Sequence, residues 1–143
     1  METGILHLHG GLRYIVLALL IWAIVSNILR KNQAFGAADR KLAMFAMVST
    51  HIQLLLGLLL WFLLGHVNNL AMMSNPVLRF KALEHPVAMI LGIVLITIGY
   101  STAKRMSDDA AKRKRIAIMY GLGLLVILSR IPWPFLVEGG KWF

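Results

Sequence analysis

The side chains best suited to chemistry in this chain are its five histidines. His51 lies near the middle of a long apolar run, and His85 lies near the start of the next one. His7 and His9 precede the first run. An ionisable side chain at membrane depth costs about 2.5 kcal/mol or more to insert, so it is by default a candidate functional residue. His66 follows an apolar run, and we expect it to be a connector residue.

Neutral histidines on facing helices can provide the two axial ligands of a b-type haem. His51 and His85 are the first candidate pair. Counting at about 1.5 Å per residue places them about 10 Å apart in depth, so His9 with His85 is an alternative pair. In a third arrangement, His51 belongs to a separate polar or quinone site. Arginines can pair with haem propionates. The candidates are Arg13, Arg79 and Arg130, which we expect at the same face of the membrane as four of the five histidines.

A metal site is the second hypothesis for the same side chains. His7 and His9 form a His-x-His pair that can chelate zinc or copper in an extended segment, and Glu84 and His85 add further ligands. His51 completes the set of candidate metal ligands. The chain has no cysteine, which excludes thiolate sites, disulfides and covalently attached haem.

The sequence contains few residues that are suited to enzymatic catalysis. There are only six aspartate and glutamate residues, and Glu84 is the only one near a predicted helix-bundle position. A nucleophile or a carboxylate pair is therefore a weaker hypothesis than ligand binding. We expect an electron-transfer or accessory subunit rather than an enzyme by itself.

The composition indicates an integral membrane protein. Hydrophobic residues make up 59% of the 143 residues and charged residues 15%, and the mean hydropathy is +0.74. In soluble domains charged residues alone are about a quarter of the chain. The net charge of +9 would suggest nucleic acid in a soluble domain, but here the basic residues flank apolar runs, where they set topology and attract anionic lipid. We expect a lipid bilayer, and no nucleic acid, as the partner.

The apolar runs predict four membrane spans in a single domain covering residues 1–143. The expected spans are about 12–29, 41–64, 77–102 and 116–137. Short connectors make successive helices antiparallel neighbours, so we predict an all-α, up-down four-helix bundle. Pro86 lies inside the third span and predicts a kink or a loosened turn, because proline removes a backbone donor.

The distribution of charge predicts the orientation of this bundle. By the positive-inside rule, the side with most lysines and arginines is cytoplasmic. Ten of the fifteen basic residues share one side: Arg30, Lys31, Arg40, Lys41, Lys104, Arg105, Lys112, Arg113, Lys114 and Arg115. Both termini and the connector between the second and third spans then lie on the periplasmic side of a bacterial inner membrane.

Glycines along the third span allow two interpretations. His85, Gly92 and Gly99 recur every seven residues and stay roughly on one face, which would leave room for a flat macrocycle. Small residues also let membrane helices approach closely. On that second interpretation Gly57, Gly92, Gly99, Gly121 and Gly123 are packing points.

Several short motifs are distributed along nearly the whole chain. They are His7-Leu8-His9-Gly10-Gly11-Leu12-Arg13-Tyr14, Thr50-His51-Ile52-Gln53-Leu54-Leu55-Leu56-Gly57, Glu84-His85, Ile96-Thr97-Ile98-Gly99-Tyr100-Ser101 with Lys104-Arg105, and Ile131-Pro132-Trp133-Pro134. Together they resemble those of a family of small bacterial four-helix membrane proteins labelled cytochrome b or cytochrome-b-like. The resemblance implies roles for His7, His9, His51 and His85, and it leaves His66 outside.

These observations predict a membrane protein that holds haem b non-covalently between its helices and transfers electrons. Quinone or a larger respiratory complex is the expected partner. One alternative is a cofactor-free accessory subunit of a larger membrane complex. Another is a membrane protein that binds a metal at its outer face.

Overall fold

The computed structural model describes residues 2–135, and within them all regular secondary structure is helical, as predicted. The long helices are α1 (Glu2–Leu29), α2 (Ala37–Leu63), α4 (His85–Ala103) and α5 (Asp109–Ser129). The connector between α2 and α4 contains a 3-10 helix η1 (His66–Ala71), a short helix α3 (Pro76–Arg79) and a π-helical turn η2 (Phe80–Glu84).

Local sequence explains where several of these elements begin. Asp108 caps α5, because its carboxylate accepts a hydrogen bond of 2.6 Å from the backbone N–H of Ala111. Asn75 caps α3 in the same way. Gly65 has a φ of +66°, which favours glycine, and it separates α2 from η1. The loosened turn predicted around Pro86 is present as the π-helical turn η2, which joins α3 and α4 into one apolar helix.

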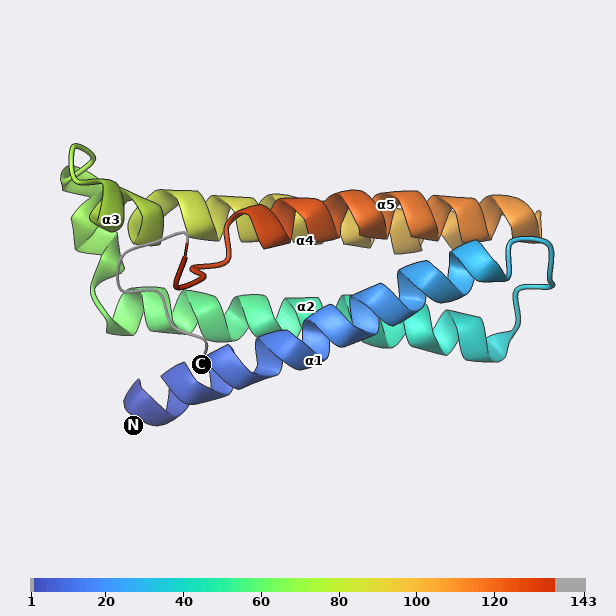
Figure 1. Cartoon of the computed structure of the whole chain (residues 1–143), viewed down its shortest axis with the longest axis horizontal. Coiled ribbons are helices and arrows are strands. Elements are labelled where there is room, and N and C mark those ends of the chain that lie inside the picture. The colour runs from blue at the N-terminus through green and yellow to red at the C-terminus, as the bar shows by residue number, and fades with distance from the viewer. Residues whose placement is uncertain (1, 136–143) are drawn as a thin grey trace.

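The four long helices run alongside one another, and each packs mainly against two of the others (Figure 1). Helix α1 contacts α2 and α5, and α4 contacts α5 and α2. Leu20, Ile96 and Tyr120 are fully buried between them. The Tyr120 hydroxyl donates a hydrogen bond of 2.7 Å to the carbonyl of Ala43, which links α5 to α2 through the core.

Glycines bring α4 and α5 into close contact. A Cβ atom on Gly92 would lie 2.7 Å from Ile127 Cγ1, and one on Gly99 would lie 2.6 Å from Met119 Cβ. The close-packing interpretation is confirmed for Gly92 and Gly99, but it is wrong for Gly121, where a Cβ atom would meet nothing within 4 Å. The prediction that this face of α4 leaves room for a macrocycle is wrong, because α5 occupies it.

Three helices are long and apolar enough to cross a membrane, namely Glu2–Leu29, Ala37–Leu63 and Pro76–Ala103. Large apolar side chains point away from the helix contacts, and Trp22, Leu55 and Leu125 are 63%, 67% and 65% exposed. This is the surface expected of a protein in contact with lipid, as the composition predicts.

The predicted fourth span corresponds to α5. Its first turns carry basic residues through Arg115, and the helix ends at Ser129. The predicted end of this span, at residue 137, lies outside the described residues. A fourth membrane crossing, and with it the predicted position of the termini, stays a prediction.

Candidate functional site

His51 lies in the middle of α2, beside Thr97 of α4. Its Nδ1 is 2.9 Å from the carbonyl oxygen of Met47, and because a carbonyl can only accept, this nitrogen carries the ring proton. Nε2 is 3.3 Å from Thr97 Oγ1, whose own proton is donated to the Ile93 carbonyl at 2.7 Å. A neutral His51 therefore presents an Nε2 lone pair toward α4.

His85 has the same proton arrangement at the first position of α4. Its Nδ1 donates a hydrogen bond of 2.7 Å to the carbonyl of Arg130, which leaves Nε2 as the acceptor or ligand atom. The ring stacks on Phe80 with 6.3 Å between centroids. Histidines that bind metals usually donate their second ring N–H to such a partner, and the partner fixes the ring orientation.

His9 on α1 packs into a notch on α2. The Gln53 amide donates a hydrogen bond of 2.8 Å to the His9 carbonyl, and a Cβ atom on Gly57 would lie 3.0 Å from His9 Cε1. Two buried atoms here, His9 Nδ1 and Gln53 Oε1, have no hydrogen-bond partner in the described part of the chain. His9 is near the start of α1 and His85 is at the start of α4, so both lie toward the same end of the molecule (Figure 1).

The structure does not bring His51 next to His85. Thr97, the neighbour of His51, lies twelve positions after His85 on the same helix, which is about 18 Å along the axis. Of the two histidine pairs predicted for haem, His51 with His85 is therefore not assembled, and His9 with His85 stays a prediction.

The predicted metal ligands are not assembled around one point. His7 and His9 are both within α1, where side chains two positions apart do not face each other, so the extended His-x-His chelate is not formed. Within residues 2–135, no group of three or more histidine or acidic side chains is arranged to hold a metal ion. His66 lies in η1, where burial and the nearby Lys81 charge lower its pKa.

The candidate arginines lie at the same end of the molecule as His85. Arg79 Nε donates a hydrogen bond of 2.8 Å to Glu84 Oε1, and Arg130 Nε lies 3.6 Å from Glu84 Oε2. Arg13 lies over the ring of Trp133, 5.3 Å from its centroid. Arg13 follows His9 by four positions on α1, so the two side chains lie on the same face of that helix.

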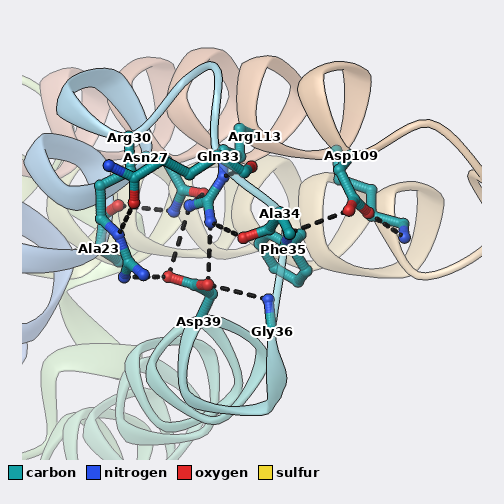
Figure 2. A network of polar contacts seen from close by, with 11 residues as sticks. Ala23, Asn27, Arg30, Gln33, Ala34, Phe35, Gly36, Asp39, Asp109 and Arg113 are labelled. Atoms are coloured by element: carbon teal, nitrogen blue, oxygen red, sulfur yellow. Dashed lines mark hydrogen bonds and ion pairs between the residues drawn. The ribbon is translucent and has the colours of Figure 1, made fainter.

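A buried ion pair at the opposite end was missed by the sequence reasoning. Arg113 is fully buried, and Figure 2 shows its guanidinium surrounded by acceptors. Its Nη2 lies 2.9 Å from Asp39 Oδ2, and its Nε donates to the Gln33 carbonyl at 2.9 Å. Arg30 contacts the second Asp39 oxygen at 2.6 Å. The positive-inside rule treats both arginines only as topology signals, and the signal for the pair is Asp39, the one acidic residue between the first two predicted spans.

Further bonds connect α5 to the α1–α2 connector. Asp109 accepts a hydrogen bond of 3.0 Å from the backbone N–H of Phe35 and one of 2.8 Å from Lys112 (Figure 2 shows the first of these). The hydrogen bond from Lys112 is the main reason that the pKa of the Asp109 carboxyl is lowered.

Two hollows open at this basic end. The larger has a volume of about 470 Å³ and lies between α2 and α4, lined by Met47, His51, Thr97, Tyr100, Ser101, Lys104 and Arg105. The smaller, of about 150 Å³, is lined in part by Arg40, Lys104 and Lys112. Tyr100 and Lys104 line both hollows, so the two hollows are adjacent.

No family model, curated protein or solved structure matches this chain. The family resemblance of its motifs therefore stays a prediction, and functional conclusions depend on the geometry of its own residues.

Proposed function

We propose that this protein binds a b-type haem non-covalently in a bacterial inner membrane, where His9 and His85 would hold it, and serves electron transfer. The observation that carries the proposal is the buried Nδ1 atom of His9, which has no hydrogen-bond partner among the described residues. Imidazole pairs of this kind are established ligands of haem iron.

The surroundings of the two histidines fit such a group. His9 Nδ1 and Gln53 Oε1 are buried without partners among the described residues, and unmet hydrogen-bonding capacity of this kind needs an explanation such as a ligand. In Figure 1 the N-terminal half of α1 diverges from α5, and residues 130–135 turn away from the line of α5 after its last residue. The ligand site lies at this end.

Each residue of the site has a defined task in the proposal. The Arg130 carbonyl holds the Nδ1 proton of His85, which keeps Nε2 available and makes the imidazole a stronger donor. Gly57 leaves space for the His9 ring. Arg13, held over Trp133, provides a cation for a propionate. A bound haem would supply a one-electron redox couple.

The proposal includes the four-span orientation. Helix α5 would enter the membrane after Arg115, so that its basic first turns join the basic connectors on the cytoplasmic side. The haem ligands would then lie near the periplasmic side. An acceptor or donor there, such as quinone or a larger respiratory complex, would exchange the electron.

A reduced-minus-oxidised absorbance spectrum of the purified protein, with haem quantified by pyridine extraction, tests the proposal. We expect a b-type α-band and about one haem per chain. His9→Ala and His85→Ala should each abolish or shift the band, whereas the matched control His7→Ala on α1 and the connector variant His66→Ala should leave it unchanged.

His51→Ala separates the two candidate pairs. An unchanged spectrum in this variant supports the His9–His85 pair, and loss of haem in it would support the pair with His51. A colourless protein after expression with added haem would contradict haem binding altogether. It would favour the accessory-subunit hypothesis.

A further inference from the structure

The basic end of the molecule holds more positive charge than its acidic residues neutralise. Arg40, Lys104 and Arg105 are exposed, and none of them makes an ion pair within residues 2–135. Arg40 lies on α2, and Lys104 follows the last residue of α4. Lys112 of α5 also lines the smaller hollow, although Asp109 partly neutralises the charge of Lys112.

The larger hollow leads from these cations into the apolar part of the molecule. Thr97 lies seven positions before Lys104 on α4, which places it about 10 Å deeper along the helix. Between them are the hydroxyl groups of Tyr100 and Ser101, about one helical turn below Lys104. Met47 lines the deep part.

We propose that these two adjacent hollows together bind one anionic phospholipid. The phosphate lies among Arg40, Lys104 and Lys112, and an acyl chain lies between α2 and α4 as far as Met47 and Thr97. Basic pockets between membrane helices on the cytoplasmic side are suited to such headgroups. The hydroxyls of Tyr100 and Ser101 lie at the depth of the glycerol esters, whose carbonyls accept hydrogen bonds.

The shape of the hollow favours a lipid over a soluble phosphate. A phosphate ion would fill only the smaller part, of about 150 Å³, near the cations. The larger part, of about 470 Å³, continues along α2 and α4, two helices that are each apolar enough to cross a membrane. A ligand that matches both parts has an anionic head and an apolar chain.

Native mass spectrometry of the full chain in neutral detergent tests this proposal, with phosphatidylglycerol and phosphatidylcholine as probes. We expect one phosphatidylglycerol per chain to be retained in preference to phosphatidylcholine. The double variant Arg40→Gln/Lys104→Gln should weaken this retention about tenfold or more, because each basic residue near the phosphate contributes roughly 1 kcal/mol. Equal retention of the two lipids by the unmodified protein would overturn the proposal.

The matched control is Lys114→Gln/Arg115→Gln. These two residues are also exposed at the basic end, but they line neither hollow. The control removes the same charge, so it should retain the lipid if the site is specific. Equal weakening by both double variants would mean that lipid is attracted only by diffuse charge, and it would contradict the site.

A third variant distinguishes the lipid from its phosphate. Ser101→Trp places an indole in the larger hollow and should weaken phosphatidylglycerol retention. Binding of glycerol phosphate, the soluble headgroup, should be unaffected by the same change. If Ser101→Trp leaves lipid retention unchanged, the acyl chain does not lie in the hollow and the proposal is wrong.

Discussion

At the scale of single residues, His51 and His85 differ in the surroundings of their Nε2 atoms. His51 and His85 both donate Nδ1–H to a backbone carbonyl, so both present an Nε2 lone pair. For His51 this lone pair faces Thr97 and the larger hollow. His85 instead lies toward the same end of the molecule as His9, its proposed partner, whereas His51 makes a polar contact between helices.

The contact between His9 and Gly57 gives a prediction at this scale. Gly57→Ala would place a Cβ atom 3.0 Å from His9 Cε1, so the imidazole must move. We expect a shifted or reduced haem spectrum, together with about 1 kcal/mol or more of lost stability from overpacking. Absorbance and thermal unfolding in detergent measure the two effects.

Gly121→Ala is the control for that change, because a Cβ atom there meets nothing within 4 Å. It should leave the spectrum unchanged. An unaltered spectrum in Gly57→Ala as well would mean that the position of His9 does not matter for the bound group.

At the scale of elements, the basic end is held together by one carboxylate. Asp39 contacts Arg113 and Arg30, so the start of α2 is tied to α5 and to the chain that follows α1. The Arg113 side chain also donates to the Ala34 carbonyl. A buried guanidinium is tolerated only with such partners, since the cost of removing it from water is several kcal/mol.

Asp39→Asn should therefore be strongly destabilising. It removes the charge that compensates the fully buried Arg113, and breaking a buried pair from one side costs about 3–5 kcal/mol. Thermal or denaturant unfolding in detergent would measure the loss. Asp108→Asn, at an exposed cap that an amide can also serve, should cost far less. Similar losses in the two variants would show that the Asp39 pair is not important for stability.

The same elements show what can be predicted from sequence. Apolar runs predicted the long helices and Pro86 predicted the loosened turn, because both signals are local. The proposed pairing of His9 with His85, and the buried position of Arg113, depend on how helices far apart in sequence pack together. Hydropathy treats Arg113 like its exposed neighbour Lys114, although only the first faces Asp39.

At the scale of the whole molecule, two kinds of chemistry lie at opposite ends. His9 and His85 lie at the end where α1 begins, whereas Arg113 and the hollow with Lys104 lie at the end of the α1–α2 connector (Figure 1). If the positive-inside rule holds, a redox site would face the periplasm and an anionic lipid would bind at the cytoplasmic side. Both functional proposals therefore depend on the orientation of the protein in the membrane.

Orientation can be measured directly, because the chain contains no cysteine that would react in the background. Single cysteines at Thr3 and Met72 should react with a membrane-impermeant maleimide in bacterial cells whose outer membrane has been made permeable, because both positions would face the periplasm. Cysteines at Asn32 and Ser107, in the two basic connectors, should react only after lysis. The reverse labelling pattern would mean that the basic connectors face the periplasm. Labelling of Thr3 and Met72 on different sides would mean that α1 and α2 do not both cross the membrane.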